Sequence, residues 1–321
     1  MKSLKRLIFA LGAFQAARFS YNVGYEAYAR NYREPYSLKN RYGENSYAVV
    51  TGSTDGLGKS YAKEFARRGL NVVLVARNEE KLALVKEEIE KEFDVNVRCI
   101  KYDFLNSVNY QSLIEIENQV RDLDVSILVN NVGNFAVNSF VDMTPKEIYN
   151  LMIVNTFPTT FLSHAFARTF LKRKKRSAII NVGSENGEVP FAYMQTYSAT
   201  KAFDNQLTKS LVPELQEKID VVLHVPGPIE TPLTSSVNST LDPQAHKFFF
   251  ALFAKFLNSK SHNSARDIID KLGYENYVAG TLRHTAEVYA VKATSPLSDY
   301  LRTVYGRFTV DALKEKRERN W

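Results

Sequence analysis

The stretch SYAVVTGSTDGLGKSYAKEFARRG, residues 46–69, decides the fold. An apolar run rich in β-branched residues leads into three glycines, and a helix-like segment follows immediately. In such a turn the first glycine permits the sharp bend, the second lets the backbone approach a pyrophosphate, and the third lets the helix pack closely on the strand. The free N–H groups at the start of the helix favour a negatively charged ligand. We therefore predict a diphosphate-binding turn formed by Gly52, Ser53, Gly56, Leu57 and Gly58.

The alternation of short apolar strands and longer helices continues beyond this unit. Strands that are apolar on both faces, with helices between them, are typical of a parallel sheet covered on both sides. Right-handed crossovers then give an α/β fold with a doubly wound parallel sheet of the Rossmann type. We predict one such domain over residues 45–290. Strands are expected at 46–51, 71–76, 95–102, 126–131, 177–182 and 220–225, and helices at 58–69, 79–93, 108–121, 145–171 and 196–218.

The composition fits one large domain in a reducing compartment. The chain has 321 residues, of which 45% are hydrophobic and 24% charged, so it can bury a full core. Its single cysteine, Cys99, excludes an internal disulfide. Because Cys99 lies in the apolar stretch VNVRCIKY, we predict a small core residue rather than a nucleophile. None of the five histidines has the spacing of a metal site, so no metal is predicted.

Residues 1–44 form an apolar and basic extension. They hold eight Lys/Arg against three Glu, while the whole chain has a net charge of +7. The apolar run is far shorter than the ~20 residues that span a bilayer. We predict an amphipathic helix that lies on a membrane surface, with packing on a partner or on its own domain as the alternatives. Apolar side chains recur at helical spacing at Leu4, Leu7, Ile8, Leu11 and Phe14.

Two further segments are basic. The run KRKKR at 172–176 lies between predicted elements and is expected to be a solvated loop, and residues 291–321 form a basic C-terminal tail. No basic face interleaved with aromatic residues indicates nucleic-acid binding. We therefore predict no nucleic-acid partner.

The end of the second predicted strand indicates which dinucleotide binds. A site for NAD usually has a carboxylate there, about 20 residues after the glycine turn, to bind the ribose 2′-hydroxyl. This chain has VARN, and Arg77 can form paired charge-assisted hydrogen bonds to a 2′-phosphate. NADP(H) is therefore the predicted cofactor, and a solvated Arg77 in an enzyme that accepts either dinucleotide is the alternative.

Two polar residues follow the next strands. Asp103, after the third strand, is placed to accept a hydrogen bond from the adenine amine. Asn131, in the NNVG that ends the fourth strand, has two possible roles: it lies beside the adenosine, or it ties its strand to a neighbour.

The segment YSATK, residues 197–201, places Tyr197 and Lys201 on one face of a helix. Reduction of a carbonyl needs a proton donor at the oxygen, and a phenol serves at neutral pH only if its ionised form is stabilised. The Lys201 ammonium would stabilise the phenolate and hold the nicotinamide ribose. Ser184, after the fifth strand, would hydrogen-bond the substrate oxygen, and Asn155, on the preceding long helix, would hold a proton-relaying water. These four are the predicted catalytic residues.

Regular alternation stops after the sixth strand. We expect a substrate lid at about 232–260, which includes the apolar run HKFFFALFAKFL at 246–257. That run could cover an apolar substrate, contact a membrane or belong to the core. Asn238 fits a glycosylation sequon, but a domain facing the cytosol would leave it unused.

The segments TGSTDGLGK, NNVG, YSATK and PGPIET, with Asn155 and Ser184, resemble the short-chain dehydrogenase/reductase family over roughly residues 45–290. The likeness is sharper to the branch that holds very-long-chain 3-oxoacyl-CoA reductases and 17β-hydroxysteroid dehydrogenases. The short N-terminal apolar segment and the strand exit PGPIETP depart from that branch. The resemblance implies a catalytic tetrad of Asn155, Ser184, Tyr197 and Lys201. It implies an NADP(H) site of Gly52, Ser53, Gly56, Leu57, Gly58, Arg77, Asp103, Asn131, Tyr197, Lys201 and Thr231, in which Thr231 contacts the nicotinamide carboxamide.

The resemblance also implies a homodimer at the cytosolic face of the endoplasmic-reticulum membrane, with a cytoplasmic location as the alternative. The leading functional hypothesis is reduction of a 3-oxo group on a long acyl-CoA or a similar lipid ketone. The second is a steroid 17β-hydroxy/keto dehydrogenase. The third is a catalytically retired protein that binds a lipid surface or a partner, against which the complete tetrad argues.

Overall fold

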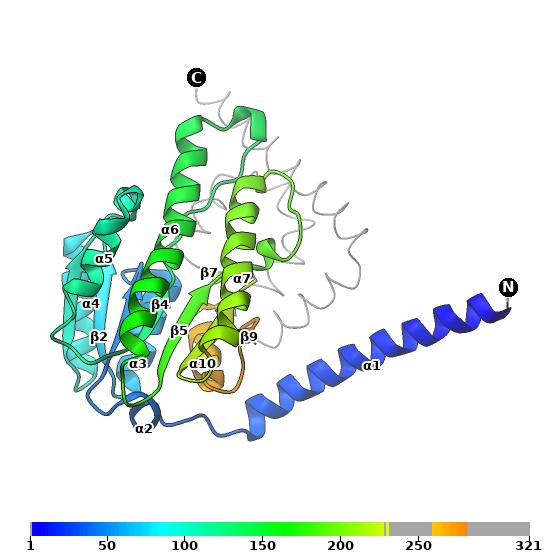
Figure 1. The fold of residues 1–321 in the computed structure, drawn as a ribbon, viewed down its shortest axis with the longest axis horizontal. Coiled ribbons are helices and arrows are strands. Elements are labelled where there is room, and N and C mark those ends of the chain that lie inside the picture. Colours follow the sequence, from blue (N-terminus) through cyan, green and yellow to red (C-terminus); the bar gives the residue numbers. More distant parts are fainter. Residues whose placement is uncertain (1, 228, 231–258, 281–321) are drawn as a thin grey trace.

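The computed structural model describes residues 2–227, 229–230 and 259–280. Within them a parallel sheet of seven strands has the order β3-β2-β1-β4-β5-β6-β9 (Figure 1). The order reverses between β1 and β4, which is where a doubly wound sheet opens a crevice at the carboxyl ends of its strands. The predicted fold class is confirmed. The strands are β1 (Tyr47–Thr51), β2 (Asn71–Ala76), β3 (Val97–Lys101), β4 (Val125–Asn130), β5 (Ser177–Val182), β6 (Ile219–His224) and β9 (Tyr277–Val278).

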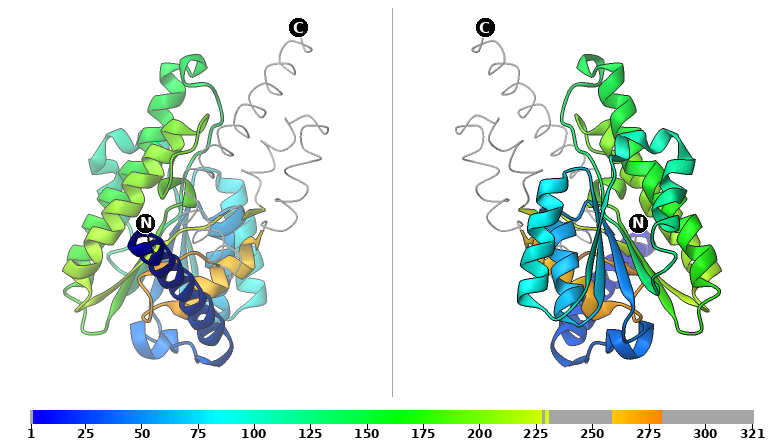
Figure 2. Two further views of the ribbon diagram at one scale, coloured as in Figure 1. Left: turned by 90° about the vertical axis from the view of Figure 1, so that its right-hand side faces the viewer. Right: turned by 90° about the vertical axis from the view of Figure 1, so that its left-hand side faces the viewer.

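Helices cover both faces of the sheet, which lies edge-on between them in Figure 2. Alternate residues along each strand point to opposite faces, so Val50 joins one hydrophobic core and its neighbour Val49 joins the other. One layer is α3 (Gly56–Arg67), α4 (Glu79–Glu92) and α10 (Ser261–Lys271), and the other is α5 (Tyr110–Asn118), α6 (Pro145–Phe170) and α7 (Gln195–Leu215).

Local signals fix where the helices begin. The α6 helix starts with Pro145 after a capping box, in which the Thr144 hydroxyl accepts from the Glu147 N–H and Glu147 accepts from the Thr144 N–H. The helix predicted at 108–121 is wrong at its start, because a 3₁₀ turn, η1 (Phe104–Val108), precedes α5. The remaining short elements are α2 (Leu38–Tyr42), η2 (Phe140–Asp142), η3 (Glu185–Gly187), β7 (Ile229–Glu230) and β8 (Ser259–Lys260).

The predicted N-terminal helix is present as α1 (Lys2–Tyr32), which runs away from the sheet in Figure 1. Its apolar side chains are not concentrated on one face, so the predicted amphipathic character is not observed. Near its C-terminus, α1 is attached to the domain by a buried Glu26–Lys271 ion pair, and Arg33, which directly follows the helix, pairs with Glu275 at 2.8 Å. In the described part of the chain, no helix is both long and apolar enough to cross a membrane. Seven aromatic side chains on the described part of α1 are exposed, and five of them recur at helical spacing: Phe14, Tyr21, Tyr25, Tyr28 and Tyr32.

The basic run at 172–176 is not wholly solvated, so that prediction is wrong for two of its arginines. Arg173 is largely buried and forms a two-pronged ion pair with Asp124, at 2.9 Å for both contacts. Arg176 pairs with Asp220 at 2.8 Å, as Arg41 does at 2.7 Å. Burial alone would raise the pKa of Asp220, but the hydrogen bonds from these arginines outweigh it and lower the pKa. The run therefore ties α2 and the sheet together.

The prediction of a buried Cys99 is also wrong. The residue is exposed on β3, the strand at one edge of the sheet. His224, in contrast, is fully buried on β6, where its ring nitrogens contact the Tyr61 hydroxyl at 2.8 Å and the Ser264 hydroxyl at 3.1 Å.

Candidate active site

The glycine turn between β1 and α3 has the backbone that the sequence predicts. Gly52 has φ +64° and Gly56 has φ +51°, a region that other residues rarely adopt. A Cβ atom on Gly58 would lie 2.2 Å from the Gly52 carbonyl oxygen and 2.6 Å from Nδ2 of Asn131. The close packing predicted for Gly58 is thus observed, and it holds the N-terminus of α3 against the turn.

The side chains of the two non-glycine residues face the protein. Ser53 is fully buried, and its hydroxyl donates weakly to the Val75 carbonyl at 3.5 Å. Leu57 is buried in the core beneath α3. What this turn offers a ligand is therefore main-chain N–H groups at a helix N-terminus, which suits an anion.

Arg77 and Asp103 lie at the carboxyl ends of β2 and β3, where the sequence places them. Arg77 is exposed and forms no ion pair within the described residues. The half-buried Asp103 accepts a hydrogen bond from the Leu105 N–H at 3.1 Å and so caps η1. The guanidinium is available to a ligand at this edge of the sheet.

Asn131 ties two strand ends together. Its side-chain amide donates to the Thr51 carbonyl at 2.9 Å, and its backbone N–H donates to the Thr51 hydroxyl at 2.9 Å. Of the two roles that the sequence leaves open, the structural one is observed. A contact with a dinucleotide remains a prediction.

The structure brings Asn155 and Lys201 together around Gly133, which follows β4. A Cβ atom on Gly133 would lie 3.5 Å from Oδ1 of Asn155 and 3.7 Å from Nζ of Lys201. Tyr197 is half-buried one helical turn before Lys201, and its ring meets the edge of Phe135 with 4.9 Å between centroids. Residues from α6, α7 and the loop after β4 thus converge beside the crevice.

Asn155 is completely buried and its side chain is already committed. Oδ1 accepts from the Asn134 N–H at 2.6 Å, while Nδ2 donates to the Asn134 carbonyl at 3.1 Å and to the Thr200 hydroxyl at 2.9 Å. This amide fixes the loop after β4 to α6 and α7. To hold a water as predicted, the Asn155 side chain would have to make a further hydrogen bond besides these three.

Ser184 follows β5 and is buried. Its hydroxyl oxygen accepts a hydrogen bond from the Asn186 N–H at 3.2 Å. A hydroxyl has one donor and two acceptor positions, so the proton of Ser184 remains available to a substrate oxygen.

One charged neighbour of the site was not predicted. Nζ of Lys201 donates to the Val182 carbonyl at 2.8 Å and to Oδ2 of Asp204 at 3.1 Å, and both charged side chains are buried. The signal was present in the sequence, since Lys201 and Asp204 have the i, i+3 spacing of an ion pair on a helix.

A strained residue supports the start of α7. Tyr193 has φ +65°, which a non-glycine residue rarely adopts, and its carbonyl accepts from the Asn138 N–H at 2.9 Å. This bond joins the loop after β4 to the segment before Tyr197. Backbone strain of this kind often accompanies functional sites.

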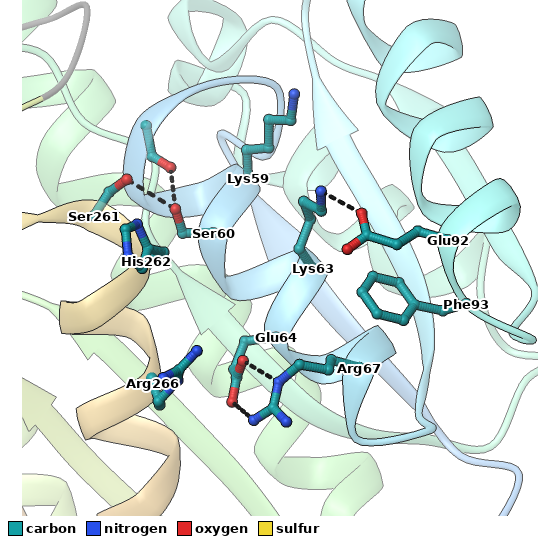
Figure 3. Close-up of a pocket in the computed structure, with 11 residues that line it drawn as sticks. Lys59, Ser60, Lys63, Glu64, Arg67, Glu92, Phe93, Ser261, His262 and Arg266 are labelled. Atoms are coloured by element: carbon teal, nitrogen blue, oxygen red, sulfur yellow. Dashed lines mark hydrogen bonds and ion pairs between the residues drawn. The ribbon is translucent and has the colours of Figure 1, made fainter.

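A groove of about 420 Å³ lies elsewhere, along the outer face of α3 (Figure 3). It is charged, but Lys63 pairs with Glu92 at 2.5 Å and Arg67 with Glu64 at 2.6 Å. Of the predicted site residues, Gly56 alone lines it. The groove is therefore separate from the residues around Gly133.

Some predicted residues lie outside the described part of the chain. These are Thr231, Asn238, most of the 232–260 lid and the 291–321 tail. In the described residues, no cluster of three or more His, Cys, Asp or Glu side chains could hold a metal ion.

Comparison with known proteins gives a consistent family. Residues 46–242 match the family model described as short chain dehydrogenase. The chain is 34% identical to "Putative steroid dehydrogenase 2" of Caenorhabditis elegans, in an alignment that covers 81% of this chain and 78% of that protein. It is 41% identical to a very-long-chain 3-oxoacyl-CoA reductase of the same organism, over 57% of this chain and 59% of the relative.

A solved structure of a dehydrogenase with its bound cofactor has a similar fold. The short-chain dehydrogenase from Sphingobium yanoikuyae in complex with NADPH superposes with a TM-score of 0.65 and 26% sequence identity. The match covers 78% of this chain and 94% of that one.

Proposed function

The chain belongs to the short chain dehydrogenase family, and from this premise we propose that it is an NADP(H)-dependent reductase of a lipid ketone. Among lipid ketones, a 3-oxoacyl-CoA is the favoured substrate. The observation that carries the proposal is the convergence of Asn155 and Lys201 on Gly133, with Tyr197 one helical turn away. An oxidoreductase of this family needs a proton donor and a cation at that place.

The described residues fit a dinucleotide. The turn before α3 leaves no room for a side chain at Gly58 and presents main-chain N–H groups, so a diphosphate can approach the backbone. The exposed guanidinium of Arg77 would bind a 2′-phosphate. When bound, NADPH supplies the hydride for the reaction.

Residues of this chain then supply the proton and stabilise the charge that its transfer leaves. The Tyr197 hydroxyl has no hydrogen-bond partner within the described residues, so its proton is free to pass to a substrate oxygen. Lys201 places positive charge one turn away, which favours the phenolate left behind. The Ser184 hydroxyl would hold the same substrate oxygen. Asn155 fixes the loop that carries Gly133 and would direct a water toward Lys201.

The 3-oxoacyl-CoA is favoured because relatives with that name reach 41% identity. A steroid ketone is the second candidate, since the relative with "steroid dehydrogenase" in its name aligns over 81% of the chain. Two other relatives named as 3-oxoacyl-CoA reductases are 32% and 36% identical.

A substrate panel separates these candidates. We expect purified full-length protein to consume NADPH with long-chain 3-oxoacyl-CoAs, with kcat/KM at least tenfold above that for oxo-steroids. Simple cyclic ketones serve as controls for non-specific reduction. Activity on oxo-steroids without activity on 3-oxoacyl-CoAs would establish the second candidate instead. NADPH binding without turnover on any ketone would favour a retired enzyme that binds a lipid surface or a partner.

We further propose that α1 lies on a membrane surface, which fits the cytosolic face of the endoplasmic reticulum. Five of its exposed aromatic side chains recur at helical spacing, and tyrosines are enriched where a membrane meets water. Lys and Arg outnumber Glu in residues 1–44 by eight to three, which favours anionic lipid.

Deletion of residues 1–30 tests the membrane proposal. We expect full-length protein to co-sediment with vesicles that contain anionic lipid, and the shortened protein to stay in the supernatant. The deletion removes Glu26 and so unpairs Lys271, which makes Glu26→Gln in the full chain the matched control that should still bind. Equal partitioning of the full-length and shortened proteins would refute the proposal.

A further inference from the structure

Two hydrogen-bond acceptors of the protein hold the Lys201 ammonium. An ammonium has three donors, and two of them are used by the Val182 carbonyl at 2.8 Å and by Oδ2 of Asp204 at 3.1 Å. Once these contacts with described residues are made, one N–H remains for a ligand. Nζ lies 3.7 Å from the position of a Cβ on Gly133, so it borders the loop that lines the crevice.

Asp204 is a carboxylate in an unusual place. Its side chain is 1% exposed, and its second oxygen, Oδ1, has no hydrogen-bond partner within the described residues. Burying a carboxylate is costly unless a counter-charge accompanies it. The sequence nevertheless places this charge on the inner face of α7, one turn after Lys201.

The groups that face Asp204 can be named from each packed element. Lys201 comes from α7 itself, the Thr159 hydroxyl comes from α6, and the Val182 carbonyl at the end of β5 shares the same ammonium. Burial raises the pKa of Asp204, while Lys201 and then Thr159 oppose that rise. Among the described residues that act on this carboxyl, Lys201 alone carries a charge.

We propose that Asp204 is a positioning residue that fixes the Lys201 ammonium and moderates its attraction for the ionised Tyr197 hydroxyl. The effect on catalysis rests on the function proposed above, whereas the ion pair itself does not. With Asp204 ionised, its negative charge offsets part of the positive charge that Lys201 presents to Tyr197. The charge of Asp204 therefore affects the pH dependence of the reaction through Lys201.

The first test is the pH dependence of the reverse reaction, oxidation of a 3-hydroxyacyl-CoA with NADP⁺, in which the ionised Tyr197 accepts the proton. In Asp204→Asn the ammonium acts without its counter-charge, so the rate should begin to rise at lower pH. Tyr197 and Asp204 are seven residues apart on α7, which corresponds to a rise of about 10 Å along the helix. At an effective dielectric constant of about 20, loss of one charge at that distance should displace the pH profile of the rate by about one pH unit.

Thr208→Val is the matched control for the pH profile. Thr208 is also buried on α7, and its hydroxyl donates to the Asp204 main-chain carbonyl at 2.7 Å. Losing this bond should lower stability but leave the pH profile in place, because no charge changes. An unshifted profile in Asp204→Asn, or an equal shift in Thr208→Val, would overturn the proposal.

The second test needs no substrate and therefore separates failure of this inference from failure of the proposed function. Lys201→Met leaves the Asp204 carboxylate buried without a counter-charge, and its melting temperature should fall by roughly 10 °C. Adding Asp204→Asn should recover at least half of that loss. Equal melting temperatures for Lys201→Met and the double variant would show that no charged pair exists there.

Discussion

Replacing Tyr197 by Phe is expected to lower kcat for NADPH-dependent ketone reduction by about 10²- to 10⁴-fold, the range that general acid catalysis contributes. The variant removes the proton donor and little else. The ring contact with Phe135 is kept, and the hydroxyl has no hydrogen-bond partner among the described residues. The measurement is steady-state NADPH consumption together with NADPH affinity from fluorescence titration.

Affinity and stability separate a catalytic loss from a structural one. The dissociation constant for NADPH should stay within about threefold of the wild-type value, and the melting temperature should stay close to it. Tyr110→Phe is the matched control, since its exposed ring stacks on Phe161 in α6 and it is not one of the predicted site residues. Loss of less than tenfold in kcat for Tyr197→Phe would remove this residue from the mechanism.

Replacing Arg77 by Ala is expected to lower kcat/KM for NADPH by about 10- to 100-fold and to leave kcat/KM for NADH within about threefold. The reason is that hydrogen bonds to a charged group contribute about 1.5–3 kcal/mol, and only NADPH has the 2′-phosphate. Arg77 is exposed and forms no ion pair among the described residues, so its removal costs little stability. Steady-state kinetics with both dinucleotides provide the measurement.

Arg98→Ala is the control for charge. Arg98 lies near the start of β3, at the other end of the strand from Asp103, and pairs with Asp122 at 2.7 Å. It removes the same charge without reaching the site, so both dinucleotides should be used as in the wild type. Comparable kcat/KM for NADH and NADPH in the wild-type protein would defeat the role given to Arg77.

The fold was predictable because its determinants are local. Each central strand is apolar on both faces, and the glycine turn fixes the chain direction between β1 and α3. The capping box at Thr144 and Glu147 marks the start of α6 in the same way. Signals of this kind act over a few residues, so a single sequence contains them.

Features that depend on distant residues were not predictable. Cys99 has apolar residues nearby in the sequence, but β3 lies at the edge of the sheet and exposes it. Arg173 seemed solvated because its partner Asp124 lies 49 residues away. The identity of an edge strand or an ion-pair partner follows from topology, which the local pattern does not contain.

The candidate site shows both situations. The i, i+4 spacing on a helix predicted that Tyr197 and Lys201 lie one turn apart. Two long-range contacts could be found only from the structure. Asn155 is hydrogen-bonded to Asn134, 21 residues away, and Lys201 to Val182, 19 residues away. Asp204 was missed because the family motif YSATK ends at Lys201, although its spacing was readable.

The central claim is that hydride from NADPH and a proton from Tyr197 reach the same ketone. The most direct measurement is mass spectrometry of the product formed from NADPH deuterated at the transferable position and a long-chain 3-oxoacyl-CoA. We expect a 3-hydroxyacyl-CoA that carries one deuterium with the wild-type protein, and almost none with Tyr197→Phe at matched enzyme concentration. Deuterated product at equal rates from both proteins, or none from a wild-type protein that binds NADPH, would contradict the account.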